Sequence, residues 1–149
     1  MRMRFLLLLL LPVLFFASCS DDRGIIFNGG SGAGSANITV DIDGQVWGAN
    51  DAYVQNVAPF GLEIYGTYSQ SNISLYITPY NGPGSYPLNG NTNIIYNEGN
   101  VTYTSTLGSI DIYSDTEEFI EGAFQCQATS NTGSTTLNFS NGYFKIRRY

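Results

Sequence analysis

The sequence contains no histidine, and the residues that we consider for chemistry are carboxylates, tyrosines and two cysteines. The lack of histidine excludes a serine triad built on His, a Cys–His dyad and the commonest zinc sites. Cys126 lies in a run of residues that alternates like a β-strand. We therefore interpret Cys126 as a small buried core residue rather than as a nucleophile.

Three carboxylates are the candidates for hydrolytic chemistry: Glu63, Asp111 and Glu121. A glycosidase needs two carboxyl groups held about 5 to 10 Å apart in a cleft. A small β domain with short loops seldom forms such a cleft. We therefore expect no enzymatic activity, no catalytic residue and no cofactor.

Two acidic stretches resemble parts of calcium sites. Asp41-x-Asp43-Gly44 matches a fragment of a calcium loop, but the further oxygen ligands and the distal Glu are missing, and a hairpin turn explains the stretch better. The densest acidic cluster runs from Asp115 to Glu121, and it includes Glu117 and Glu118. We favour a solvated strand entry for this cluster and no metal, with Ca²⁺ binding from a loop as the alternative.

Tyrosine is abundant, with 11 residues in the chain. Tyr65, Tyr76, Tyr113 and Tyr143 are predicted to lie on the strand faces opposite the core. Aromatic rings of this kind stack on sugars or on partner proteins, so these four residues form a candidate glycan- or protein-binding surface. The alternative is that tyrosine simply favours half-exposed strands.

The N-terminus carries targeting features. Arg2 and Arg4 precede an apolar run from residue 5 to 16, which is short for a membrane span of about 20 residues. We predict a signal peptide over residues 1–18. Ala17 and Ser18 lead into Cys19, an arrangement that resembles a bacterial lipobox, the position where a lipoprotein signal peptide is cut and the cysteine is lipidated. The alternatives are an ordinary secretory signal with an incidental cysteine and an uncleaved anchor.

The residues after Cys19 extend this interpretation. Ser20-Asp21-Asp22 resembles the export signal by which Bacteroidota-type lipoproteins reach the outer face of the outer membrane; a solvated acidic linker is the alternative. Residues 19–36 are predicted to form an acidic tether that becomes rich in Gly and Ser. We expect a protein held on the outer membrane by its lipid and facing outward, or alternatively facing the periplasm.

A single β domain is predicted over residues 37–149. Short runs rich in Val, Ile, Thr, Tyr and Phe alternate with turn residues every eight to twelve positions. The expected fold is all-β: an antiparallel β-sandwich, or a flattened barrel, of about 8–10 short strands. The net charge of −6 argues against a nucleic-acid partner.

Turn signals predict how the strands pair. Asp43-Gly44 is typical of a hairpin that places Trp47 opposite Val40 in the core. A four-residue loop over residues 69–72 pairs Ile64 with Ile77 and Tyr65 with Tyr76. Residues 79–87, which hold three prolines, are expected to form an edge loop.

The C-terminal third predicts a closing three-stranded antiparallel meander. A loop over residues 130–133 pairs Cys126 with Leu137. A turn at Asn141-Gly142 pairs Phe139 with Phe144.

The order of several motifs along the chain resembles a family of small Bacteroidota lipoproteins, the domain-of-unknown-function family numbered 6252. The motifs are Val40–Ala49, Gly82–Leu88, Gly108–Ile112, Ile120–Phe124 and Asn141–Phe144. The resemblance implies a β-rich lipoprotein of the surface or periplasm and brings no known activity or functional residue.

Together these features predict a non-enzymatic, lipid-anchored protein of the cell envelope that binds a glycan or an envelope protein. A structural accessory subunit of an envelope complex is the alternative, and an acidic-site hydrolase is disfavoured.

Overall fold

The computed structural model describes residues 37–149. The predicted signal peptide, the lipidation site Cys19, the export signal Ser20, Asp21 and Asp22, and the tether all lie outside the described residues. Residues 37–149 contain no helix with the length and hydropathy needed to cross a bilayer.

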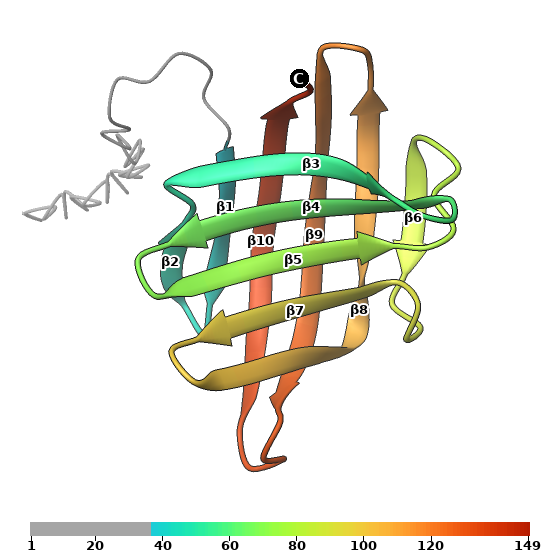
Figure 1. Cartoon of the computed structure of the whole chain (residues 1–149). Helices are drawn as coiled ribbons and strands as arrows, with labels where there is room; N and C mark the ends of the chain where they lie inside the picture. Colours follow the sequence, from blue (N-terminus) through green and yellow to red (C-terminus); the bar gives the residue numbers. More distant parts are fainter. Residues whose placement is uncertain (1–36) are drawn as a thin grey trace, which may run out of the picture.

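Ten antiparallel strands form a single sheet (Figure 1). They are β1 (Asn37–Ile42), β2 (Gln45–Gly48), β3 (Asp51–Val57), β4 (Gly61–Tyr68), β5 (Ser71–Ile77), β6 (Gly84–Pro87), β7 (Asn93–Glu98), β8 (Val101–Asp115), β9 (Phe119–Ser130) and β10 (Thr136–Arg147). Their order in the sheet is β2-β1-β10-β9-β8-β7-β5-β4-β3, and β6 pairs with β8 beside this path.

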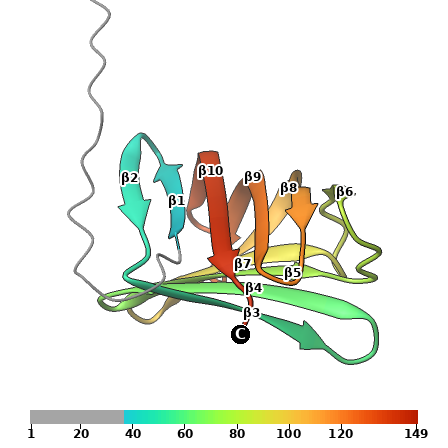
Figure 2. The same ribbon diagram turned by 90° about the horizontal axis from the view of Figure 1, so that it is seen from above.

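The sheet curls into two layers that cross at a steep angle. β3, β4, β5 and β7 run across the front of β1, β10, β9 and β8 in Figure 1, and Figure 2 shows the two layers from above. β8 belongs to both layers, because its first residues pair with β7 and the remainder pairs with β9 and β6. The predicted all-β, antiparallel fold is confirmed, in the form of one curled half-barrel.

Apolar side chains at alternate strand positions meet between the layers. The largest fully buried residues are Phe144, Ile38, Leu62, Ile64, Ile73, Leu75, Ile77, Ile94, Ile110, Ile120, Ile146 and Val40. They come from both layers, so each layer covers the apolar face of the other and keeps it from water. The side chains at the intervening positions face outward and are available for function.

The first hairpin has the predicted register. Asp43 and Gly44 take φ angles of 47° and 80°, as a two-residue hairpin turn requires, and Val40 pairs with Trp47. Trp47 is buried, and its indole Nε1 donates a hydrogen bond to Ser71 Oγ at 2.8 Å. The prediction that this tryptophan is a core residue is confirmed.

The predicted register between β4 and β5 is wrong by two residues. The two strands are joined by a two-residue turn, in which Ser69 has a φ of 54°, rather than by a four-residue loop. Ile64 therefore pairs with Leu75 and not with Ile77. The inward face was still predicted correctly, because a two-residue shift keeps alternate side chains on the same side.

This shift changes which outward residues are neighbours. Tyr65 pairs with Ser74, and Tyr76 pairs with Glu63. The two tyrosines are therefore diagonal neighbours on the same face rather than a directly opposed pair.

The predicted three-stranded closing meander is also wrong, because Asn141-Gly142 is not a turn. β10 continues through it as one strand from Thr136 to Arg147, with a bulge at which Asn141 has a φ of 54°. One extra residue reverses the inward alternation, so Phe139 and Phe144 are both buried although five positions separate them.

Three further expectations need correction. The turn between β9 and β10 lies one residue later than predicted, so Phe139 rather than Leu137 pairs with Cys126. The segment expected to be an edge loop contains β6, which pairs with β8 at the side of the sheet. β8, β9 and β10 have 15, 12 and 12 residues, so these strands are long rather than short.

Candidate functional site

The four tyrosines predicted to form one surface lie on two different layers. Tyr65 on β4 and Tyr76 on β5 face outward from the front layer. Tyr113 on β8 and Tyr143 on β10 belong to the other layer. The structure therefore brings Tyr65 and Tyr76 together and separates them from the other two.

A third tyrosine completes the front group. Tyr53 on β3 pairs with Tyr65 across the ladder, and the two rings lie 5.0 Å apart between centroids with an interplanar angle of 32°. Tyr53 is 40% exposed, so the pair forms an aromatic platform that solvent reaches. We call the outward surface of β3, β4, β5 and β7, with Tyr53, Tyr65 and Tyr76, the tyrosine face.

Glu63 lies among these rings and is only 7% exposed. Gln55 Nε2 donates a hydrogen bond to Glu63 Oε2 at 2.5 Å, and a hydrogen bond to Glu63 raises the pKa of Tyr76. Desolvation, followed by the charge of Glu63, raises the pKa of Tyr53. Glu63 is therefore surrounded by uncharged side chains, namely Gln55, Tyr53 and Tyr76. Because the pKa of each tyrosine is raised, both tyrosines stay protonated at neutral pH.

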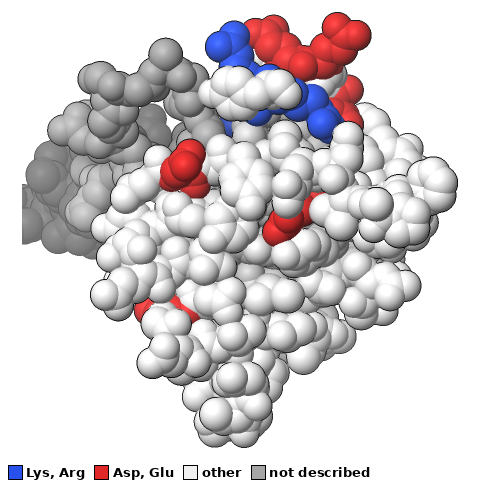
Figure 3. Space-filling model, in the orientation of Figure 1, with Lys and Arg blue, Asp and Glu red and all other residues white. Residues whose placement is uncertain are grey.

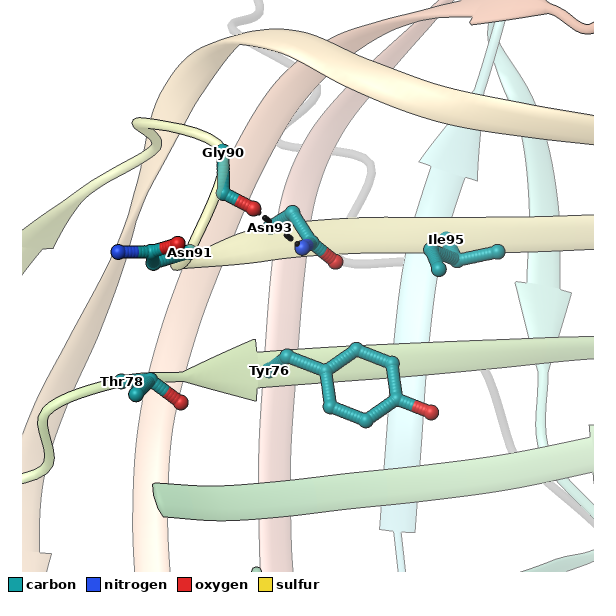
Figure 4. A pocket seen from close by; sticks show the side chains of 6 residues that line it. All are labelled: Tyr76, Thr78, Gly90, Asn91, Asn93 and Ile95. Carbon is teal, nitrogen blue, oxygen red and sulfur yellow. Dashed lines mark hydrogen bonds between the residues drawn. The ribbon is translucent and has the colours of Figure 1, made fainter. Parts of the chain in front are cut away.

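An open hollow of about 410 Å³ adjoins Tyr76 between β5 and β7 (Figure 4). Its lining combines an aromatic ring, an aliphatic side chain, a hydroxyl and two amides: Tyr76, Ile95, Thr78, Asn91 and Asn93, with Gly90 at the rim. Asn93 Nδ2 donates to the Gly90 carbonyl at 2.9 Å, whereas Asn93 Oδ1 is buried and has no hydrogen-bond partner among residues 37–149.

The tyrosine face carries little charge. Figure 3 views the molecule from this side and shows few acidic side chains and, over the strands of this face, no basic ones. The basic residues of the described chain gather at the top of this view, at the C-terminal end of β10, where Lys145 pairs with Glu121 at 3.0 Å, Arg147 with Glu118 at 3.1 Å and Arg148 with Asp115 at 2.7 Å. We call these six residues the charged end.

Tyr143 and Tyr113 have different surroundings from the front tyrosines. The Tyr143 hydroxyl donates to Glu121 at 2.8 Å, and burial together with this bond raises the pKa of Tyr143. Lys145 and Tyr143 lower the pKa of Glu121. Tyr113 is 62% exposed and makes no aromatic contact with a described residue.

The acidic stretches considered for calcium are held by protein partners. Within the acidic cluster, Asp115, Glu118 and Glu121 each bind a basic side chain of the charged end. Asp43 occupies the hairpin turn and accepts hydrogen bonds from Asn138. Across the part of the chain that the structure describes, no three His, Cys, Asp or Glu residues group as metal ligands.

The remaining sequence candidates are also placed. Glu63 lies on the front layer, whereas Asp111 on β8 and Glu121 on β9 lie on the other, so the three carboxylates do not form one group. Cys126 is buried, as predicted, and desolvation raises the pKa of its thiol to about 12.

Sequence reasoning missed Tyr53, Gln55 and Asn93. The signal for the first two was the alternation in residues 51–57, where Ala52 and Val54 point toward the core and Tyr53 and Gln55 point away. For Asn93 no signal exists in one sequence, since its unpaired oxygen depends on the turn that places Gly90 beside it.

The comparison with protein families gives one match. The model described as "Domain of unknown function (DUF6252)" matches residues 34–146, and the chain belongs to this family, as the sequence resemblance indicated. No curated protein and no solved structure matches the chain.

Proposed function

We propose that this DUF6252 member is a non-enzymatic, lipid-anchored protein of the cell envelope whose tyrosine face binds a glycan. The observation that carries the proposal is the solvent-reached pair of Tyr53 and Tyr65 next to Gln55 and Glu63, with Asn93 on the same face two strands beyond β4. These groups lie on one open face of a rigid sheet.

The chemistry of the face suits a sugar. A pyranose ring offers an apolar C–H face that packs on an aromatic ring and hydroxyl edges that need hydrogen-bond partners. Tyr53 and Tyr65 supply the ring surface, and the amides and hydroxyls next to Tyr76 supply the partners. Because the face carries few charged side chains, a neutral ligand can bind there without desolvating many ionised groups, which is unfavourable.

The N-terminal sequence supports the location. Lipid on Cys19 anchors the chain to a membrane, and Ser20-Asp21-Asp22 directs it to the outer face. By its composition, a Gly- and Ser-rich tether with the length of residues 19–36 is expected to span roughly 20 to 25 Å on average, enough for the domain to stand clear of the headgroups. A glycan outside the cell is then within reach.

Location is tested on cells by labelling with palmitate and by shaving intact cells with protease. We expect the wild type to be acylated and shaved, and the Asp21→Ala/Asp22→Ala variant to be acylated but protected. Acylation and location that are unchanged in Cys19→Ala would refute the lipid anchor.

Binding is tested by probing the full-length protein with a panel of polysaccharides. Tyr65→Ala should lose binding, and Tyr113→Ala, which changes an exposed tyrosine on the other layer, should retain it. Equal losses in both variants, or binding by neither the wild type nor the control, would reject the tyrosine face as a glycan site.

A further inference from the structure

The Asn93 side-chain amide uses its nitrogen in a hydrogen bond, whereas its oxygen has no partner among the described residues. Its Nδ2 donates to the Gly90 carbonyl at 2.9 Å, while its Oδ1 is buried with no donor among residues 37–149. A buried acceptor without a donor is unfavourable, and in proteins such an atom usually has a reason. Across the described residues it is the one buried side-chain N or O atom in this condition.

The orientation of this amide is set by the turn before β7. Gly90 has a φ of 89°, and the turn is closed by Asn89 N donating to the Thr92 carbonyl at 3.0 Å and by Thr92 N donating to Asn89 Oδ1 at 3.1 Å. Gly90 therefore presents its carbonyl to the Asn93 amide nitrogen. Figure 4 shows the Asn93 oxygen on the side of the amide away from Gly90, and Asn93 and Tyr76 are both among the residues that line the hollow.

The charge around the hollow restricts the ligand. Glu63 is the direct cross-strand neighbour of Tyr76, and Tyr76 is the direct neighbour of Asn93. The basic side chains Lys145, Arg147 and Arg148 are occupied at the charged end. An anionic sugar would meet the field of Glu63, and none of the basic side chains among residues 37–149 lies over the strands of this face to offset it.

The distance from the aromatic platform to the hollow also restricts the ligand. The Tyr53–Tyr65 pair lies on β3 and β4, and the hollow lies between β5 and β7. In the strand order β3-β4-β5-β7, two strand spacings separate the middle of the platform from the middle of the hollow, about 9.5 Å. A single sugar ring on the platform does not also fill the hollow, whereas a short oligosaccharide does.

We propose, on the basis of the proposed glycan binding, that the ligand is an uncharged oligosaccharide that crosses the strands from Tyr53 to the hollow and donates a hydroxyl or acetamido N–H to Asn93 Oδ1. The half-exposed ring of Tyr76 moves to admit this donor. Binding supplies the partner that the oxygen lacks in the free protein.

The test measures affinities of the full-length protein in detergent by calorimetry. The probes are the neutral oligosaccharides chitohexaose and mannohexaose, the anionic hexagalacturonate, and the monosaccharides N-acetylglucosamine and mannose. At least one neutral hexamer should bind tenfold or more tightly than hexagalacturonate and than either monosaccharide. Equal affinity for neutral and anionic hexamers would overturn the inference.

Two variants test the residues. Asn93→Leu removes the unpaired oxygen at similar size and should weaken the preferred hexamer at least tenfold. Because this variant also loses the bond to Gly90, folding is checked by circular dichroism. Ile95→Lys adds a cation beside the hollow and should raise the affinity for hexagalacturonate at least tenfold, a gain that misfolding does not produce.

The outcomes separate this inference from the proposed function. Oligosaccharide binding that does not depend on Tyr65, or no oligosaccharide binding at all, rejects both the proposed glycan-binding function and this inference. Binding that depends on Tyr65 but is unchanged in Asn93→Leu supports glycan binding and rejects the contact with Asn93. Binding that depends on Tyr65 but does not distinguish neutral from anionic hexamers supports glycan binding and rejects the preference for an uncharged ligand.

Discussion

Tyr53 and Tyr65 on the tyrosine face differ from Tyr143 and Tyr80 at the charged end in how their hydroxyls are used, and Tyr76, which hydrogen-bonds Glu63, resembles the second pair. At the charged end, Tyr143 donates to Glu121, and next to it Tyr80 donates to Asp115 at 2.6 Å, so both hydroxyls are engaged within the protein. On the tyrosine face, the rings of Tyr53 and Tyr65 pack against each other in a tilted arrangement, and their hydroxyls form no hydrogen bond with another described residue. Tyrosines whose polar ends are already bound stabilise the fold, whereas tyrosines with free polar ends remain available to a ligand.

The comparison predicts that a substitution at the charged end lowers stability, and the largest effect is expected for Asp115→Ala. This carboxylate accepts from Tyr80 and, at 2.8 Å, from Arg148 Nε, and its side chain is only 17% exposed. Loss of both bonds should lower the free energy of unfolding by about 2 kcal/mol, since Arg148 is left without its partner. Urea denaturation measures the change.

The matched control is Glu118→Ala. Glu118 pairs with Arg147, but the two side chains are 64% and 47% exposed. Water screens such a pair, so its loss should cost less than about 0.5 kcal/mol. Equal losses for the two variants would contradict the difference that we draw between the partly buried Asp115–Arg148 pair and the exposed Glu118–Arg147 pair.

On the tyrosine face, Tyr65→Ala should lower ligand affinity at least tenfold, which corresponds to about 1.4 kcal/mol of binding free energy. Its unfolding free energy should fall by less than about 1 kcal/mol, because the ring is half-exposed and lies outside the core. Calorimetry and urea denaturation give the two numbers. A variant that binds normally but is strongly destabilised would show that this tyrosine is structural.

The engaged tyrosines predict a pH dependence at the alkaline end. Burial and the bond to Asp115 raise the pKa of Tyr80 in the folded protein, so its stabilising contribution is complete below pH 10 and is lost as the pH rises above that value. Tyr80→Phe should flatten the decline of stability above pH 10. An unchanged slope in the variant would show that Tyr80 does not titrate with folding.

The smallest effect is expected at acid pH. Lys145 and Tyr143 lower the pKa of Glu121 in the folded protein, so the contribution of Glu121 is present above pH 4.5 and is lost as the pH falls below it. Glu121→Gln should reduce this acid loss slightly, since the pair with Lys145 is exposed. Thermal unfolding of the wild type and the variant at pH 3 and pH 6 measures this loss of stability. A larger loss between pH 6 and pH 3 in the variant would contradict the contribution that we assign to Glu121.

Local sequence signals predicted the faces of the strands better than their registers. Asp43-Gly44 specified its hairpin because both residues tolerate positive φ and the flanking apolar residues agree with one pairing. In the β4–β5 hairpin, two registers that differ by two residues bury the same side chains, so periodicity cannot choose between them. The register depends on a positive φ at Ser69, and serine is not a residue type that predicts positive φ.

Asn141-Gly142 shows a second limit. The same dipeptide suits a hairpin turn and a bulge, because both need a residue with positive φ. The bulge is selected by tertiary pairing, since β10 lies between β1 and β9 and pairs with both along its length. The candidate site was half predictable for the same reason: Tyr65 and Tyr76 follow from alternation, but their neighbours follow from how the sheet curls.

The most direct test of the central claim is an amide NMR titration of the full-length protein in detergent with the neutral hexamer that binds best. We predict that the shifted resonances cluster on β3, β4, β5 and β7, with Tyr53, Tyr65, Tyr76 and Asn93 among the largest. Shifts that cluster instead around Tyr113 and Tyr143, or shifts on neither face at saturating ligand, would contradict the claim that the tyrosine face is the binding surface.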